Sequence, residues 1–383
     1  MIAQTLEMAY QKFHAVVEKI SSSQHWLLYT VILSTALSIF MSFPRKEVYW
    51  NVSDVPQFMG FMEKVEAPFT PLKFEKGSHE SKLSFRLTMP VLAHCLKMNM
   101  AAIKLFEFFI GILFFYITAK LIYDITSDKI FAFIGTLSTG LVYPGASSFI
   151  DLWGTFDGLA YCLLLMSMLS RNPFLILFFV ATALFTDERA MPASCFVILF
   201  HIKDLQRNFT GLVRSLANMS CMAVVAAWII YLSGRFYLSY FHGLETDKGN
   251  IGLHLIPLQL NNFPAGLWSG IEGFWIILLL PFIPLIKKRE YIFALLYFMT
   301  ILAISALSMS VFDITRSMAY MFPAVFTGLK IISENESKNF IKHMFFCIFL
   351  LSLLWPTYFV GSKDELWWFA PYLPIQMVRS FFM

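Results

Sequence analysis

The sequence predicts an all-α fold: a polytopic transmembrane helix bundle of about 10–12 spans, with a long outer loop after the first span. Hydrophobic residues make up 58% of the 383 residues and charged residues only 14%, whereas soluble domains carry about 25% charged residues. The mean hydropathy is +0.65. Apolar stretches approaching the length that crosses a bilayer, about 20 residues, recur from Trp26 to Val360.

The first 25 residues differ from the rest of the chain. Leu6, Tyr10, Phe13 and Val17 recur at helical spacing among polar residues, which predicts an amphipathic helix lying on the cytoplasmic membrane surface over 1–25. A short solvent-exposed leader is the alternative.

Residues 26–360 form the predicted transmembrane domain. It contains a polar outer loop at 44–90 and is followed by an outer-side tail at 361–383. Apolar runs predict the spans near 26–43, 101–123, 130–145, 156–170, 173–186, 190–202, 215–238, 265–286, 291–311, 317–333 and 340–360.

The distribution of Lys and Arg predicts the orientation. If the N-terminus is cytoplasmic, most basic residues of the short loops, such as Lys287, Lys288 and Arg289, fall on the cytoplasmic side. The five cysteines lie singly, which fits neither a disulfide framework nor a zinc site. We therefore expect a bacterial inner-membrane protein. No basic cluster interleaved with aromatics indicates nucleic-acid binding.

Ionisable residues at the outer ends of the spans are the candidate functional residues, because charge at a membrane edge is costly. They are Asp54, Arg86, Asp151, Asp157, Asp187, Glu188, Arg189, Asp313 and Arg316. No sequence pattern for a metal site accompanies them.

Two of the candidates lie in the 44–90 loop, and each has two interpretations. Asp54 is either a general base or the N-cap of a short helix that begins near Pro56. Arg86 is either an anchor for a phosphate group or an interfacial arginine that reaches the lipid headgroups.

The remaining candidates occur in short turns. Asp187, Glu188 and Arg189 stand in a row between two apolar runs, where they either bind substrate or pair with one another and cap the next helix. Asp313 and Arg316 have i,i+3 spacing, so they either form an intrahelical ion pair or direct the arginine into a cleft.

Asp151 and Asp157 flank Trp153 and Gly154. An aromatic face beside carboxylates suits a sugar ring, which presents both C–H faces and hydroxyl groups. An aromatic residue of the membrane-interface belt is the alternative for Trp153.

This arrangement resembles the GT-C superfamily of polytopic membrane glycosyltransferases. The resemblance is carried by SDVPQF with Asp54, FRLTMP with Arg86, the TDERA turn and FDITRSMAY. It implies transfer of a sugar from a polyprenyl-phosphate donor to a glycan or lipid acceptor on the non-cytoplasmic face. Asp54 would be the catalytic base, and Arg86, Arg189 and Arg316 would bind the donor phosphate. No second acid adjoins Asp54, so a divalent metal stays open as a cofactor.

Other functions are compatible with the same pattern. An oligosaccharide polymerase or ligase also uses outer-face arginines and lipid-linked substrates. A lipid or oligosaccharide transporter would place ionisable residues along a route through the bilayer, whereas here they favour one face. A membrane acyltransferase would carry a catalytic histidine within a span, whereas His201, His242, His254 and His343 fall in loops or at the periphery. A structural membrane subunit is a further alternative. The enzyme hypothesis predicts that the scattered acids and arginines meet at one cavity.

Overall fold

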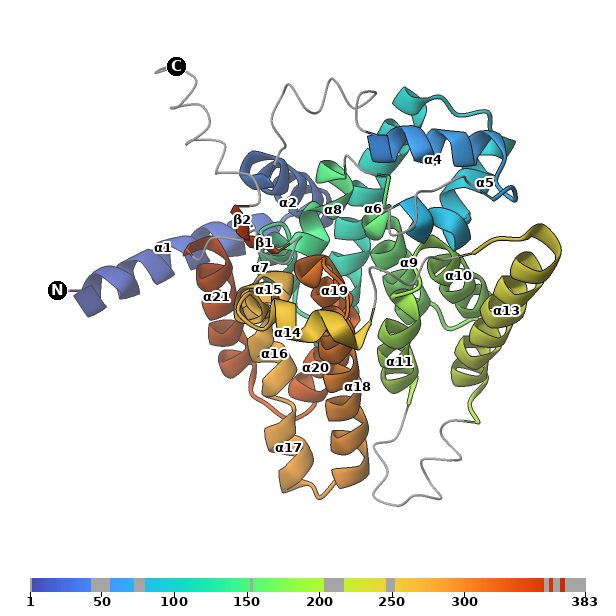
Figure 1. Cartoon of the computed structure of the whole chain (residues 1–383). Helices are drawn as coiled ribbons and strands as arrows, with labels where there is room; N and C mark the ends of the chain where they lie inside the picture. Colours follow the sequence, from blue (N-terminus) through green and yellow to red (C-terminus); the bar gives the residue numbers. More distant parts are fainter. Residues whose placement is uncertain are drawn as a thin grey trace.

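The computed structural model describes residues 2–42, 56–71, 80–151, 154–202, 217–245, 252–354, 358–360 and 366–368. These residues form an all-α bundle with one two-stranded antiparallel sheet (Figure 1). The N-terminal half contains α1 (Ile2–Ser21), α2 (Trp26–Ser42), α4 (Pro56–Glu66), η2 (Glu80–Phe85), α5 (Thr88–Cys95), α6 (Met100–Thr126), α7 (Lys129–Thr139), α8 (Tyr143–Ile150), α9 (Asp157–Leu169), α10 (Pro173–Thr186) and α11 (Ala190–His201).

The C-terminal half continues the bundle. It contains α13 (Met219–His242), η3 (Leu253–Leu255), α14 (Ile256–Gln259), α15 (Phe263–Ile271), η4 (Glu272–Phe274), α16 (Trp275–Leu279), α17 (Phe282–Lys287), α18 (Tyr291–Met309), α19 (Ile314–Ala319), α20 (Phe322–Ser333), α21 (Lys338–Leu354), β1 (Tyr358–Val360) and β2 (Leu366–Trp368).

The bundle is a multi-pass membrane protein by the length and composition of its helices. Within the described residues, four segments are long and apolar enough to cross a bilayer: Met100–Thr126, Met219–His242, Phe263–Lys287 and Tyr291–Met309. The pair α7 and α8 passes the same test together but bends by 56° at its break. Four shorter apolar helices, α2, α9, α10 and α11, coincide with further expected spans. Their lengths of 12 to 17 residues are below the roughly 20 residues of a straight crossing.

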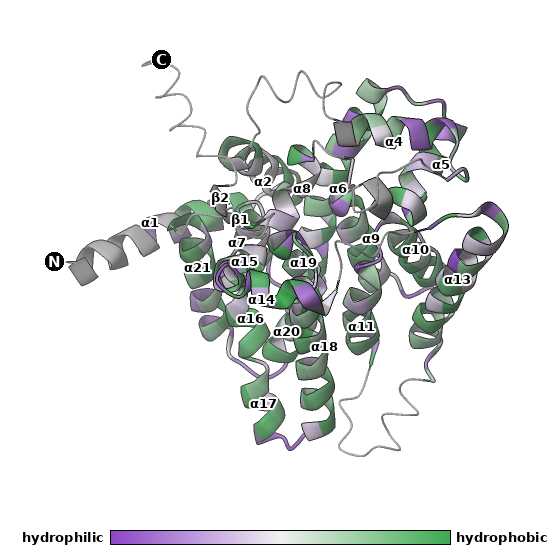
Figure 2. Ribbon diagram, in the orientation of Figure 1, coloured by the Kyte–Doolittle hydropathy of each residue, from purple (hydrophilic) through white to green (hydrophobic). Residues whose placement is uncertain are grey.

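The surface of the bundle is apolar where a soluble protein would be polar. Large side chains such as Phe236 and Tyr240 on α13, and Leu295 on α18, are more than half exposed. Figure 2 shows the same hydrophobic character along α13, α17 and α18. Because lipid tails are themselves apolar, such a surface is stable in a bilayer.

The interior of the bundle holds α8, all of whose residues are buried. Helix α9 packs against α6, α8 and α10, and α10 packs against α13. The bend between α7 and α8 follows Gly140, and Pro144 occupies the first turn of α8, where proline is tolerated because its missing N–H would be unpaired anyway. Asp151 directly follows α8 and Asp157 begins α9, and both candidate aspartates are buried.

We predict that Gly158→Ala destabilises this packing. A Cβ at Gly158 would clash with Ser148 Oγ on α8, so α8 and α9 would have to separate. Overpacking of this kind costs about 1–3 kcal/mol. Unfolding monitored by tryptophan fluorescence in detergent measures the loss. Gly234→Ala on α13 is the control, since its nearest new contact is the ring tip of Phe185 at 3.0 Å. Equal stability of the two variants would contradict the prediction.

Helix α1 and the β1–β2 pair are the first and last elements that the structure describes. Helix α1 lies within the stretch for which an amphipathic N-terminal helix is expected and projects to one side (Figure 1), with His14 and Val17 buried. The last expected span, 340–360, differs from the structure: α21 ends at Leu354, two residues before Pro356, because proline cannot continue a helix. Tyr358–Val360 then pairs with Leu366–Trp368, inside the expected tail.

Candidate functional site

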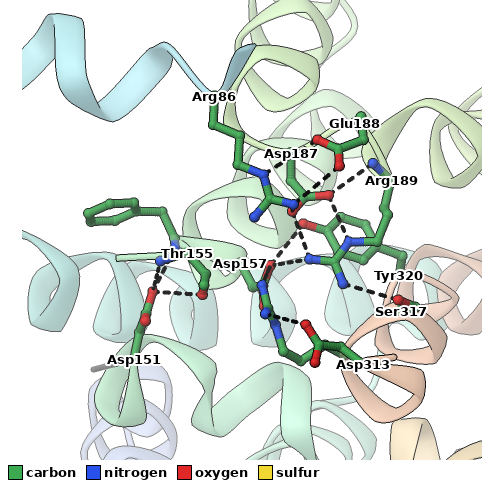
Figure 3. A network of polar contacts seen from close by, with 12 residues as sticks. Arg86, Asp151, Thr155, Asp157, Asp187, Glu188, Arg189, Asp313, Ser317 and Tyr320 are labelled. Atoms are coloured by element: carbon green, nitrogen blue, oxygen red, sulfur yellow. Dashed lines mark hydrogen bonds and ion pairs between the residues drawn. The ribbon is translucent and has the colours of Figure 1, made fainter. Parts of the chain in front are cut away.

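A network of charged side chains lies where four separate segments meet (Figure 3). Arg86 comes from the start of α5, Asp157 from the first turn of α9, and Asp187–Arg189 from the turn between α10 and α11. Asp313 and Arg316 come from the start of α19. Seven of the nine candidate residues therefore occupy one cluster, which we call the acid–arginine cluster: Arg86, Asp157, Asp187, Glu188, Arg189, Asp313 and Arg316.

Asp157 is the centre of the acid–arginine cluster and is 1% exposed. Its Oδ2 lies 2.6 Å from Arg316 Nε, and its Oδ1 lies 3.0 Å from Arg189 Nη2. Two tyrosines also donate to this carboxylate: the hydroxyls of Tyr143 and Tyr320 lie at 3.1 and 3.3 Å. One carboxylate thus joins two arginines that are 127 positions apart (189 and 316).

Asp187 forms the second node and has no exposed surface. It accepts hydrogen bonds from the backbone N–H of Arg189 at 2.9 Å and from its Nε at 2.8 Å, which is the geometry of an Asx turn. Its Oδ2 also pairs with Arg86 Nη2 at 2.8 Å. Burial by itself would raise the pKa of Asp187, but Arg189 and Arg86 outweigh it and hold that pKa well below its usual range.

Glu188 and Asp313 occupy the rim of the acid–arginine cluster. Glu188 receives Arg86 in a two-point contact, from Nη2 at 3.2 Å and from Nε at 3.4 Å, while its side chain stays 34% exposed. Asp313 pairs with Arg316 Nη1 at 2.8 Å. The residues of the TDER turn and the Asp313–Arg316 pair therefore pair locally and also meet in one cluster.

Aromatic residues, which sequence reasoning missed, support the arginines. The Arg189 guanidinium lies over the ring of Tyr320, 4.9 Å from its centroid. Tyr161 donates to the Arg316 carbonyl at 3.2 Å and packs edge-on against Tyr320. Tyr320 follows Arg316 by four positions, so helical spacing could have flagged it. Nothing local in the sequence distinguishes Tyr143 or Tyr161.

A cavity of about 780 Å³, including its part open to solvent, adjoins the acid–arginine cluster. Its charged wall consists of Arg86, Glu188, Arg189, Asp313 and Arg316. The rest of its lining comes largely from α18 and the residues after it: Ile304, Leu307, Ser308, Ser310 and Val311. Leu307 is 48% exposed, so the cavity reaches the apolar outer surface of the bundle. The cavity lining thus combines charged residues with largely apolar ones.

Asp151 lies apart from this cavity (Figure 3). Its carboxylate accepts hydrogen bonds from the N–H of Thr155 at 2.7 Å, the Thr155 hydroxyl at 2.9 Å and the N–H of Phe156 at 2.6 Å. These bonds hold the turn that precedes Asp157, in which Phe156 has a left-handed backbone (φ 54°). In this structure Asp151 positions the chain rather than lining the cavity. Asp54, the expected base, lies outside the described residues.

Three charged residues away from the turns were not anticipated: Lys64 and Glu107 are buried, and Lys104 is partly buried. In α6, Lys104 pairs with Glu107 at 3.3 Å, and Lys104 also donates to the Asp151 carbonyl. In α4, Lys64 has no exposed surface, and burial lowers its pKa to about 8. The sequence offered no signal for them, because Lys64 reads as a polar residue of the loop and the α6 pair as ordinary helix charges near a membrane edge.

The described residues contain no group of three or more His, Cys, Asp or Glu side chains that could hold a metal ion. The carboxylates of the acid–arginine cluster instead face guanidinium groups. No protein-family model matches the chain, and no curated protein matches it with significant similarity.

Proposed function

We propose that this chain is a membrane glycosyltransferase that moves a sugar from a polyprenyl-phosphate donor to a glycan or lipid acceptor on the non-cytoplasmic face. In this proposal the N-terminus is cytoplasmic and the protein resides in a bacterial inner membrane. The observation that carries the proposal is the cavity, because its lining contains five charged residues while the rest is largely apolar and includes Leu307, which is exposed at the bundle surface. An amphiphilic substrate with a charged head and a lipid tail matches both parts of this lining.

The donor phosphate would bind at the charged wall of the cavity, beside Arg86, Arg189 and Arg316. Within the described residues, every side-chain nitrogen of Arg189 and Arg316 has a partner. Arg86 uses Nε and Nη2, while its Nη1 has no described partner. A guanidinium offers five N–H donors, so Arg86 keeps donors for a phosphate oxygen. Arg189 and Arg316 would act mainly by fixing the charged wall before the substrate arrives.

The acceptor hydroxyl would require a base, and we propose Asp54 for this role. Among the described carboxylates that line the cavity, Glu188 is the most exposed, which makes it the competing candidate. Asp157 and Asp187 are buried in contacts with two arginines each. A carboxylate held in this way has no accessible oxygen with which to accept a proton from the acceptor.

The direct test is a transfer assay on the full chain in phospholipid vesicles. The donors are short-chain polyprenyl-phosphate sugars, each with a radiolabelled sugar. We expect the wild type to release polyprenyl phosphate and to move the label from one donor into a new product. Arg86→Met should weaken donor binding by about 10- to 100-fold, because a charge-assisted hydrogen bond is lost. Arg171→Met, at an exposed loop position, is the control.

Two outcomes would contradict the proposal. Movement of an intact labelled lipid across the vesicle membrane, without bond cleavage, would indicate a transporter. Equal donor affinity in Arg86→Met and the wild type would show that Arg86 and the charged wall of the cavity do not recognise the donor.

A further inference from the structure

The exposed surface of α13 changes in character along the helix. From Met219 to Gly234 the sequence contains no charged residue, and the exposed large side chains of this part are aliphatic: Met219, Met222, Val225, Ile229, Ile230 and Leu232. From position 236 onward the exposed large side chains are aromatic and each is more than half exposed: Phe236, Tyr237, Tyr240 and Phe241. We call these four residues the α13 aromatic surface.

The rings of the α13 aromatic surface form one patch. Phe236 and Tyr240 stack with their centroids 6.2 Å apart and their planes inclined by 13°. Tyr237 and Phe241 lie 4.7 Å apart. Phe69, which follows α4, is 47% exposed, and its ring lies 6.1 Å from that of the histidine that ends α13. The patch therefore receives side chains from two segments that are distant in the sequence.

The length of α13 indicates where this patch lies in a bilayer. The helix has 24 residues, which at about 1.5 Å per residue makes it about 36 Å long. The hydrocarbon core of a bilayer is about 30 Å thick, so one end of a moderately tilted α13 extends into a headgroup region. Tyrosine is enriched there because its ring is apolar while its hydroxyl stays hydrated. The aromatic end of α13 is therefore the end that suits a headgroup region.

The same end of α13 packs beside the acid–arginine cluster. The Arg235 guanidinium lies over the ring of Phe85, 4.3 Å from its centroid. Tyr231 packs edge-on against Phe185, with the centroids 5.1 Å apart. Phe85 and Phe185 stand one and two residues before members of the acid–arginine cluster. The depth of this end of α13 in the bilayer therefore sets the depth of the cluster.

We propose that the α13 aromatic surface, together with Phe69, docks into the headgroup region of the bilayer and holds the acid–arginine cluster at that depth. The partner is the lipid itself: the tyrosine hydroxyls contact hydrated headgroups, while the rings contact the upper part of the acyl chains. The surface continues the exposed aliphatic face of α13, a helix long and apolar enough to cross the membrane, and this continuity favours lipid over a second protein. The docking does not depend on the proposed reaction.

The test measures depth by electron paramagnetic resonance on the full chain in phosphatidylcholine vesicles. A nitroxide is attached to Ser239→Cys or to Ile229→Cys, both exposed positions of α13. The accessible native cysteines are replaced by alanine: Cys95, Cys195 and Cys347. Collision rates with oxygen, which concentrates among acyl chains, and with a water-soluble nickel chelate report the depth of each label. We expect the label at 239 among the headgroups and the label at 229 about 15 Å deeper, at 1.5 Å per residue.

Two further sets of variants complete the test. Lys288→Cys, at the end of α17, supplies the reference for a label in water. Tyr237→Leu combined with Tyr240→Leu retains apolar area but removes the hydroxyls, and leucine prefers the hydrocarbon core, so the label at 239 should move toward the bilayer centre. Ile230→Leu combined with Leu232→Ile is the matched control on the aliphatic face and should leave that label at its original depth.

The inference is overturned if the label at 239 collides with the nickel chelate as freely as the label at 288, because the aromatic surface would then lie in water. It is also overturned if the label at 239 is as deep as the label at 229. A label at 239 that is shielded from both reagents would place a second copy or another part of the chain on this surface instead of lipid. An unchanged depth in the double tyrosine variant would show that the aromatic residues do not fix the position of α13.

Discussion

Replacing Asp157 with asparagine is expected to lower the free energy of unfolding by about 3–5 kcal/mol, the cost of breaking a buried ion pair on one side. The variant keeps the shape of the side chain but removes the charge that Arg189 and Arg316 share. Arg316 is 4% exposed and the Arg189 side chain 15%, so water can replace the lost partner only in part. Thermal unfolding in detergent, followed by tryptophan fluorescence, measures the effect.

Asp313→Asn is the matched control for this experiment. Asp313 pairs with the same Arg316, but its side chain is 17% exposed against 2% for Asp157. Water can replace part of the lost interaction, so the loss should stay near 1 kcal/mol. If Asp157→Asn were as stable as Asp313→Asn, the acid–arginine cluster would not depend on its central carboxylate.

Asp54→Asn is expected to reduce the rate of sugar transfer by about 10²–10⁴-fold, the usual contribution of a general base. Donor affinity should stay unchanged, because the proposed binding site of the donor phosphate is the charged wall of the cavity and does not include Asp54. The vesicle assay with a short-chain polyprenyl-phosphate sugar measures the transfer rate at saturating donor. This rate decides whether Asp54 is the base. The variant should express and unfold like the wild type, which separates a chemical effect from a folding defect.

Glu188→Gln distinguishes the two candidate bases. Glu188 lines the cavity and pairs with Arg86, so its loss should change donor affinity more than the saturating rate if Asp54 is the base. A large loss of rate in Glu188→Gln, with Asp54→Asn active, would transfer the role to Glu188.

The sequence predicted the fold class and the turns in which the charged residues of the acid–arginine cluster occur. A composition of 58% hydrophobic and 14% charged residues leaves no soluble alternative, and the helical bundle follows because unpaired backbone groups are too costly in lipid. The charged turns stood out for the same reason, since Asp187, Glu188 and Arg189 interrupt apolar runs. The prediction that the acids and arginines meet at one cavity holds for Arg86, Glu188, Arg189, Asp313 and Arg316.

Other features depended on contacts that form only in the folded protein, and local sequence patterns did not predict them. Asp151 stabilises the turn before Asp157 because the backbone N–H groups of Thr155 and Phe156 donate hydrogen bonds to its carboxylate. The single span expected near 130–145 did not anticipate the bend between α7 and α8, after which all residues of α8 are buried. Burial of Lys64 depends on where α4 settles against the 154–156 turn, which no local pattern encodes.

The amino-acid sequence by itself determined that this protein is a helical membrane protein whose costly charges gather in a few turns, because hydropathy and charge act locally on each segment. Only the tertiary structure decided which charges neutralise one another. Arg189 and Arg316 both pair with Asp157 because the starts of α9, α11 and α19 lie close together in the fold. The strength of an ion pair in a low-dielectric interior depends on the distance between the two charges. Residue spacing along the chain does not specify that distance.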